Sequence, residues 1–353
     1  MRKLGLVLVA LAVALGLNEL LLRAFWTNPF VREQPDEVLL LRWHHAGFDQ
    51  EIDRRALKLE PPIVRLRVGP QGYIEPSQQF PDPEFTLVFQ GGSTTECAVV
   101  QEDLRWPVRV SAELAEHGFR TNARNAGKSG NTAHDALVNL VQFVVPERPD
   151  VVLLMHGVND AGLIAAGGYG LRAPETDGWR MGLRWLGETA AQHSSLVGFV
   201  RRVMNIQRPE IRRAADDLAP LGGTPGTELY VARVRAWVRT ARAFGIEPVL
   251  ITEPLSTLRN EITPPWTDAG ALNAFNQKVR EIGSEEGATV IDLAELVKSQ
   301  PEWANPAAIY YDGMHVNDAG ARIYGRLVAE ALAKDVLPKL RAARAAQPPQ
   351  SPR

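Results

Sequence analysis

The sequence predicts an α/β protein of three layers, in which helices flank a parallel sheet of five strands. Two observations predict this class. From residue 85 onward, short apolar runs alternate with longer segments of helical periodicity, which is the pattern of parallel strands joined by right-handed helical crossovers. Residues 151–155 are apolar at every position, as expected for a central strand that is covered on both faces.

Five strands and five helices follow one another along this part of the chain. The predicted strands are residues 85–89, 119–125, 151–155, 248–252 and 289–293. The predicted helices are residues 104–117, 132–145, 230–244, 269–283 and 317–332. Pro146 and Pro149 end the second helix, because proline cannot continue a helix.

The composition of the 353 residues is that of an ordinary globular protein and excludes several classes of function. The net charge of −2 gives no overall attraction to nucleic acid, so no nucleic-acid partner is expected. The single cysteine excludes an intrachain disulfide. No cluster of residues has metal-ligand spacing, so neither a metal nor another cofactor is expected.

Residues 1–26 have the pattern of a signal-anchor or transmembrane segment. Arg2 and Lys3 precede a long apolar run, which predicts a cytoplasmic start and a catalytic part on the periplasmic or extracellular side. Glu19 and Arg23 lie four residues apart and can pair on one helix face. Trp26 suits the membrane interface. A cleaved signal peptide and a cytoplasmic apolar helix are the alternatives.

The remaining chain divides into three further parts. The predicted parts are a juxtamembrane segment at 27–84, an α/β domain at 85–338 that carries an insertion at 161–226, and a disordered tail at 339–353. The insertion interrupts the alternation of strands and helices. Its Trp179 and Trp185 suit either stacking on sugar rings or packing a small core of their own. The sequence does not define an oligomeric state.

Four polar clusters lie where ligands bind in such sheets, beyond the carboxyl ends of the strands. Three of them directly follow predicted strands, and the fourth precedes the last helix. The clusters are residues 90–97 (QGGSTTEC), 125–132 (NAGKSGNT), 156–160 (HGVND) and 312–317 (DGMHVN).

These clusters, in this order, resemble the sequence blocks of the SGNH (GDSL-type) hydrolase superfamily over about residues 85–335. Membrane-anchored bacterial members with a Gly-Gly-Ser-Thr-Thr-Glu first block are the most similar subgroup. In this chain Gly92 stands where the family usually has an aspartate before its nucleophile. The resemblance implies a flavodoxin-like sheet of five parallel strands, in agreement with the strand count above.

The resemblance also implies the site. Ser93 would be the nucleophile, His315 the general base and Asp312 the group that orients the imidazole. The backbone N–H groups of Ser93 and Gly127 and the side-chain amide of Asn159 would form the oxyanion hole. Read without the resemblance, the serine is a helix cap, the asparagine belongs to an Asx turn, and the last histidine lies on the surface.

Other residues near these clusters allow more than one interpretation. Cys97 is expected on the same helix face as the serine, as a buried and unreactive thiol. Glu96 is either an exposed carboxylate in the first helical turn or a contact to the pocket. Glu253 either faces the cleft or belongs to a turn. His44 and His45 lie in the membrane-proximal segment, away from any catalytic setting.

Three functions fit these observations. The first is an extracytoplasmic serine esterase that removes acyl groups, acetyl among them, from a carbohydrate or lipid through an acyl-enzyme. The second is an O-acyltransferase that uses the same residues with a sugar hydroxyl as acceptor. The third is a catalytically silent binding protein. The expected partners are therefore a small-molecule, glycan or lipid ester and a membrane.

Overall fold

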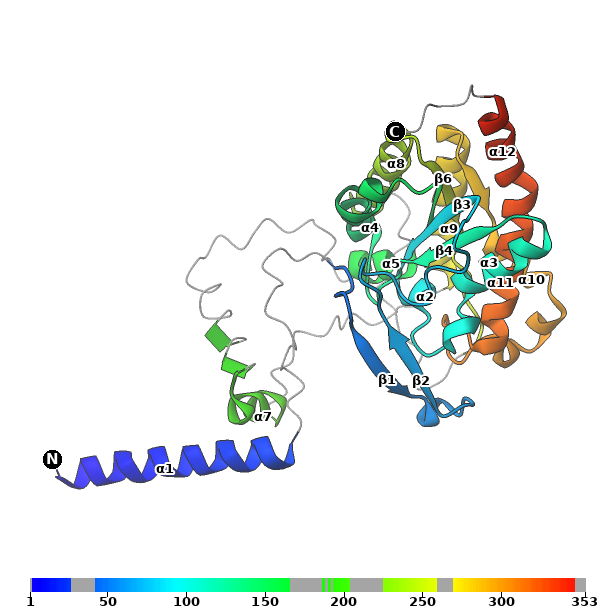
Figure 1. Cartoon of the computed structure of the whole chain (residues 1–353). Coiled ribbons are helices and arrows are strands. Elements are labelled where there is room, and N and C mark those ends of the chain that lie inside the picture. Colours follow the sequence, from blue (N-terminus) through cyan, green and yellow to red (C-terminus); the bar gives the residue numbers. More distant parts are fainter. Residues whose placement is uncertain are drawn as a thin grey trace. The chain divides into compact units, whose positions relative to one another are not determined.

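The computed structural model describes residues 2–26, 42–165, 186–187, 190–191, 193–203, 225–258 and 269–346 (Figure 1). The chain forms two compact units. Residues 1–40 and 170–212 make up one, here called the N-terminal unit. Residues 41–169 and 213–353 make up the other, here called the α/β unit. Trp179 and Trp185 of the predicted insertion lie outside the described residues.

The α/β unit contains a sheet of five parallel strands in the order β4-β3-β5-β6-β7. The strands are β3 (Phe85–Gly91), β4 (Thr121–Asn125), β5 (Val151–Met155), β6 (Glu247–Ile251) and β7 (Thr289–Ile291). Each lies within two residues of its predicted range. β3 comes first in the sequence of this sheet but second in its spatial order. Strand β4 lies on one side of β3 and β5 on the other, so the order of strand addition reverses and a switch point lies between β3 and β5. The predicted fold class is confirmed.

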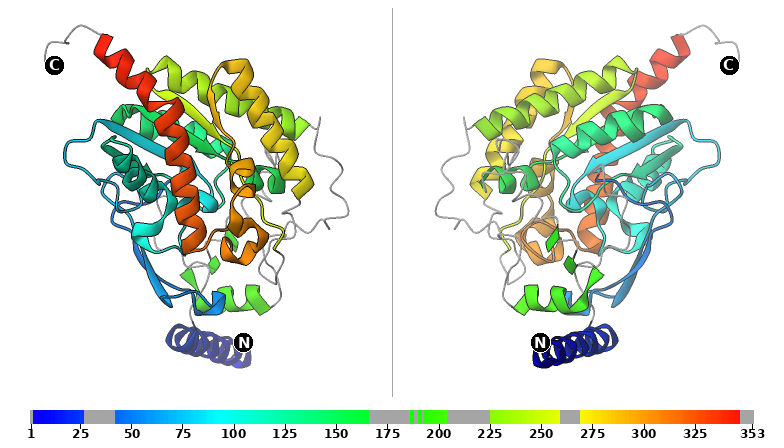
Figure 2. Two further views of the ribbon diagram at one scale, coloured as in Figure 1. Left: turned by 90° about the vertical axis from the view of Figure 1, so that its right-hand side faces the viewer. Right: turned by 90° about the vertical axis from the view of Figure 1, so that its left-hand side faces the viewer.

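Helices cover both faces of this sheet (Figure 2). One group comprises α3 (Trp106–Glu116), α10 (Leu293–Lys298), α11 (Asp318–Asp335) and α12 (Leu337–Ala346). The other comprises α4 (Ala133–Asn139), α5 (Val158–Ala165), α8 (Pro225–Ala243) and α9 (Ala269–Glu286). Leu87 and Phe89 pack against the first group and Val88 against the second, as the two-residue period of a strand requires.

Residues 42–84 belong to the α/β unit, so this unit begins before the predicted boundary at residue 85. Strands β1 (Asp49–Asp53) and β2 (Ile63–Arg67) form an antiparallel pair. Val68 and Ile74 then bridge across a tight turn, and the Ile74 N–H donates to the carbonyl oxygen of Asn125 in β4. Apolar side chains of this segment are buried, so hydrophobic burial fixes it to the sheet. Residues 27–41 lie outside the described part.

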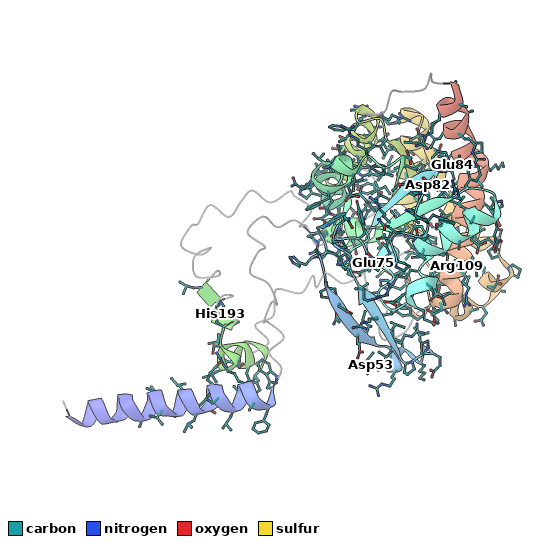
Figure 3. All side chains as sticks on the ribbon, in the orientation of Figure 1. Asp53, Glu75, Asp82, Glu84, Arg109 and His193 are labelled. Carbon is teal, nitrogen blue, oxygen red and sulfur yellow. The ribbon has the colours of Figure 1, made fainter. Side chains whose placement is uncertain are left out.

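The predicted disordered tail is helical as far as Ala346, and that part of the prediction is wrong. Arg341 of α12 makes a bidentate ion pair with Glu84, at 2.5 Å for each bond; Glu84 is labelled in Figure 3. Arg344 pairs with Asp150. The same two guanidinium groups lie over phenylalanine rings of the sheet edge. These contacts hold a segment whose composition alone indicates disorder. Residues 347–353 lie outside the described part.

The N-terminal unit contains two described helices of known bounds, α1 (Arg2–Phe25) and α7 (Ser195–Val203), which contact each other. The predicted pairing of Glu19 with Arg23 is confirmed, with a distance of 2.7 Å between Oε1 and Nε. Among the described residues, no helix has the length and apolarity needed to cross a membrane.

Candidate active site

Ser93 begins a four-residue helix, α2 (Ser93–Glu96), directly beyond the carboxyl end of β3. Two glycines make this turn possible because other segments approach the backbone closely. A Cβ at Gly91 would lie 2.0 Å from Thr95 Oγ1, and one at Gly92 would lie 2.5 Å from Asn159 Nδ2. The asparagine amide therefore occupies the space where an aspartate side chain at position 92 would begin.

A continuous chain of hydrogen bonds joins Ser93, His315 and Asp312. Ser93 Oγ lies 2.8 Å from His315 Nε2, and His315 Nδ1 lies 2.7 Å from Asp312 Oδ2. A carboxylate only accepts, so Nδ1 carries the proton and Nε2 is left to accept from the serine hydroxyl. The structure thus brings together the three residues that the sequence predicted as a triad, in the order of contact that a nucleophile, base and orienting acid require.

Asp312 is buried and held in place by its own loop. Its Oδ1 accepts hydrogen bonds from the backbone N–H groups of Met314 (2.8 Å) and His315 (2.6 Å). Burial by itself would raise the pKa of this carboxyl, but the hydrogen bonds and charge of His315 outweigh burial and lower the pKa below its usual value. Asp312 is therefore ionised at neutral pH.

Tyr311 holds the imidazole from one face. Its ring stacks on that of His315 with centroids 5.5 Å apart and planes 7° apart, and its N–H donates to the His315 carbonyl oxygen (3.1 Å). The bridge between Tyr310 and Val316 closes this loop. Helix α11 then begins behind Asn317, whose side chain caps it.

Asn159 and Gly127 differ in how they fit the predicted oxyanion hole. Asn159 Nδ2 donates to the carbonyl oxygen of Asn131 (2.9 Å), and this bond fixes the amide beside Gly92. The second hydrogen of Nδ2 is not used by this bond and can donate to a substrate oxygen. The Gly127 N–H instead donates to Asn125 Oδ1 (2.9 Å). A Cβ at Gly127 would lie 2.4 Å from the backbone nitrogen of Glu96. Gly127 therefore makes room for helix α2, whereas a pocket was expected.

Glu96 is buried, and it contacts the loop after β4 and a histidine that sequence analysis set aside. Its Oε2 accepts from both the N–H and the hydroxyl of Ser129. Its Oε1 lies 3.3 Å from His44 Nε2, and that nitrogen lies 2.9 Å from the Gly127 carbonyl oxygen. Both partners of Nε2 are acceptors, so Nε2 carries a proton. Burial raises the pKa of Glu96, and the His44 and Ser129 contacts outweigh it and lower the pKa.

Arg42 also makes hydrogen bonds to the loop after β4. Its guanidinium donates to Asn131 Oδ1 (3.1 Å) and to the Ser129 carbonyl oxygen (2.5 Å), while the Asn131 side chain donates to the Arg42 carbonyl oxygen (3.2 Å). Arg42 and His44 are thus the contacts that sequence reasoning missed, because no motif marks their segment. We call residues 42–44 the strap and residues 127–131 the strapped loop.

Glu253 is buried and bonded to groups of the protein, and neither of its two interpretations describes that position. Its Oε1 accepts from the Thr94 hydroxyl (2.6 Å) and its Oε2 from the Val158 N–H (2.9 Å). Asn276 holds its backbone at both N and O. Burial raises the pKa of Glu253 above its usual value against the lowering effect of these hydrogen bonds. One carboxylate therefore joins α2 to the first turn of α5, which carries Asn159.

Two smaller predictions have different outcomes. Cys97 is buried, as expected, but it is not on the serine's helix face. Helix α2 ends at Glu96, and Cys97 adopts the left-handed region with φ of 52°. Asp160, in the first turn of α5, was expected to brace its segment through backbone bonds, and its Oδ1 accepts from the Ala133 N–H (3.0 Å). Within the described ranges, no group of three or more His, Cys, Asp or Glu side chains is placed to hold a metal.

The chain is similar to a number of solved structures, of which three are described. An acetylxylan esterase, Axe2 from Geobacillus stearothermophilus, is 20 % identical, with a TM-score of 0.43, and covers 70 % of this chain and 94 % of its own. A putative lipolytic protein of the G-D-S-L family from Desulfitobacterium hafniense is 14 % identical (TM-score 0.44; 70 % and 100 % covered). The acetyl xylan esterase AlAXEase is 18 % identical (TM-score 0.45; 71 % and 100 % covered).

The sequence comparisons give one match. No curated protein is similar to the chain at a significant level. The family model described as the GDSL-like Lipase/Acylhydrolase family matches residues 89–323, a range that spans well over half of the chain and includes Ser93, Asn159, Asp312 and His315. The chain therefore belongs to the GDSL-like lipase/acylhydrolase family of serine ester hydrolases.

Proposed function

We propose that the protein is an extracytoplasmic serine esterase, attached to a membrane, that removes acyl groups from a carbohydrate or lipid. The observation that carries the proposal is the hydrogen-bonded chain from Ser93 Oγ through His315 to Asp312. Family membership supports ester chemistry. The acetyl group is the first acyl group to test, because it makes the smallest demand on space beside the serine.

The geometry supports a two-step reaction through an acyl-enzyme. His315 Nε2 takes the Ser93 proton as Oγ attacks the ester carbonyl carbon, and the carbonyl oxygen becomes an oxyanion. When the intermediate collapses, the proton passes to the leaving alcohol oxygen and the acyl group remains on Oγ. Water then attacks the acyl carbon with the same base, releasing the acid and restoring the serine. Asp312 keeps the imidazole in the tautomer that both steps need.

The oxyanion would receive its hydrogen bonds from the Ser93 N–H and from the second hydrogen of Asn159 Nδ2. The Gly127 N–H is engaged by Asn125, so we infer that a third donor comes from elsewhere in the strapped loop. Gly130 is the candidate: it has φ of +77° and is exposed. Among the described residues, no acceptor is bound to its N–H.

The proposed location rests on the leader. Arg2 and Lys3 before the apolar run favour a cytoplasmic N-terminus with the rest of the chain exported. The resemblance of the first block, Gly91 to Glu96, to that of membrane-anchored members agrees with this location. Alkaline phosphatase and green fluorescent protein, each fused to the C-terminus, test it: phosphatase activity without fluorescence is expected, and the reverse would overturn it.

Hydrolysis of p-nitrophenyl acetate and longer p-nitrophenyl esters by the full chain tests the activity. Ser93→Ala and His315→Ala should fall to background while remaining folded by circular dichroism. Wild-type turnover that survives Ser93→Ala would refute the nucleophile. The transferase alternative predicts p-nitrophenol release that depends on an added sugar acceptor and yields an acylated sugar. The silent binding protein predicts no release with any ester.

A further inference from the structure

The N-terminal unit has an apolar surface that extends over both of its helices. Helix α1 exposes large apolar side chains along its whole described length, where a helix of a water-soluble protein has a polar face. They are Val7, Leu11, Val13, Leu15, Leu17, Leu20, Leu21 and Phe25, between 48 % and 86 % exposed. Between Lys3 and Phe25 the sequence has only three polar side chains, those of Asn18, Glu19 and Arg23.

Each of these three polar side chains has a partner within the protein. Asn18 Nδ2 donates to the Ala14 carbonyl oxygen one turn earlier (2.8 Å). Arg23 Nε donates to Glu19 Oε1 (2.7 Å). Such internal pairing is unnecessary in water and is what hydrocarbon surroundings demand, because lipid offers no hydrogen-bond partner.

The remaining bonds of Glu19 and Arg23 go to the beginning of α7. Glu19 accepts from the N–H groups of Ser195 (2.9 Å) and Leu196 (2.8 Å) and from the Ser194 hydroxyl (2.8 Å). Arg23 Nη2 donates to the carbonyl oxygen of His193 (2.9 Å). The ion pair of the leader thus caps the first turn of α7, although the two segments lie far apart in sequence.

Helix α7 continues the apolar surface and has the composition of an interfacial helix. Val197, Phe199, Val200 and Val203 are exposed, with spacings of three and four residues. The Phe199 ring contacts that of Trp26 at the end of α1, with centroids 5.6 Å apart and planes at 89°. The sequence of α7 also contains two arginines, at positions 201 and 202. A helix sequence that combines apolar residues with arginines, and a nearby tryptophan, are typical of the lipid–water interface.

We propose that α7 binds the lipid–water interface as a second membrane contact, held in place by Glu19 and Arg23 of α1. The proposal rests on the membrane attachment inferred above and assigns a role to this part of the predicted insertion. The occupant is a lipid bilayer: its hydrocarbon would meet the exposed apolar side chains of both helices, and its anionic phosphates suit the positive charge that two arginines give to the α7 sequence. Hydrogen bonds from Glu19 and Arg23 join α1 to the N-terminal end of α7. The two helices would therefore bind the membrane together.

Site-specific fluorescence on the full chain tests the proposal. The protein is reconstituted into vesicles of phosphatidylethanolamine and phosphatidylglycerol, and an environment-sensitive thiol probe is attached to Val13→Cys, Val200→Cys or His45→Cys. The native thiol does not compete, because Cys97 is buried and burial raises its pKa to about 12. Spin labels on the lipid acyl chains quench probes that lie in the bilayer. His45, exposed on the α/β unit, is the aqueous control.

We expect lipid spin labels to quench the probes at positions 13 and 200 and to leave the probe at 45 unquenched. Glu19→Ala should abolish quenching at 200 and preserve it at 13, and Glu19→Gln, which keeps one acceptor, should lose less. Quenching at 13 without quenching at 200 overturns the role of α7 and leaves membrane attachment standing. Absence of quenching at both positions overturns both. A probe at 200 that is shielded from water yet unquenched by lipid indicates a protein partner and also overturns the proposal.

Discussion

The strap provides a sharp test of how the site is held together. His44→Ala removes the Nε2–H group that donates to Glu96 and to the Gly127 carbonyl oxygen. A hydrogen bond to a charged group is worth about 1.5–3 kcal/mol, so the free energy of unfolding should fall by about that amount. The strapped loop also carries the Asn131 carbonyl oxygen that fixes the Asn159 amide (2.9 Å). Loss of the strap should therefore misplace the Asn159 amide, which is proposed as an oxyanion donor.

The effect on catalysis has an upper bound. Complete loss of one oxyanion donor costs about 10²–10³ in kcat, and a displaced loop retains part of it. We therefore expect kcat on p-nitrophenyl acetate to fall about ten- to a hundred-fold, with KM nearly unchanged, since the donor acts in the transition state. His44→Gln should recover much of the loss, because its side-chain amide can donate from a similar position.

The matched control is His45→Ala, which alters the neighbouring and exposed histidine and should change neither kcat nor stability. Stopped-flow or steady-state assays are compared with urea unfolding of the same preparations. A His44→Ala enzyme with wild-type kcat would refute the reasoning. So would a loss of activity that merely follows the unfolded fraction, or one of equal size in His45→Ala.

Three further predictions concern the buried groups around the triad. Asp312→Asn should lower kcat by about 10⁴, as when the corresponding carboxylate is removed from a serine protease. The free energy of unfolding of this variant should also depend less on pH in the acid range. A carboxyl with a lowered pKa stabilises the fold above its usual pKa and loses that effect as pH falls. An unchanged pH dependence in thermal unfolding would contradict this. Glu253 has a raised pKa, so the wild type should lose stability as pH rises above 4.5 through the raised value, and Glu253→Gln should lack that slope in unfolding curves. Gly127→Ala places a Cβ 2.4 Å from the Glu96 backbone nitrogen and should cost about 1–3 kcal/mol in urea unfolding; wild-type stability would show that α2 can move aside.

The residues that sequence could identify lie in short blocks at strand ends. Ser93, Asp312 and His315 can be named because their blocks resemble those of the SGNH superfamily. The predicted sheet adds that polar clusters beyond its strand ends lie near one another. Most strands of the sheet are predictable as short apolar runs, whereas β4 is largely polar (TNARN) and gave a weaker signal. Asn159 can be named through the same family resemblance, and its orientation depends on Asn131 from the neighbouring block.

The contacts that sequence could not identify depend on tertiary pairing across the chain. His44 has no motif, and its partner Glu96 was open to two interpretations. The end of α2 at Cys97 was also invisible, because its left-handed conformation depends on tertiary contacts, among them the bond from Arg105 Nε to the Cys97 carbonyl oxygen (3.2 Å). Helix α12 was missed because its composition indicates disorder, whereas ion pairs and ring contacts with the rest of the unit stabilise it.

The hydrogen bond between Ser93 and His315 spans 222 positions of the chain, and this separation has a consequence for folding. Contacts of long sequence separation bear the largest loop-closure cost, so they form late. Ser93 reaches His315 only after β3 and the segment before α11, which are far apart in the sequence, have both docked. Newly synthesised protein therefore passes through a stage with a formed sheet and an inert serine. Esterase activity should report completion of folding, whereas far-ultraviolet circular dichroism reports its earlier stages.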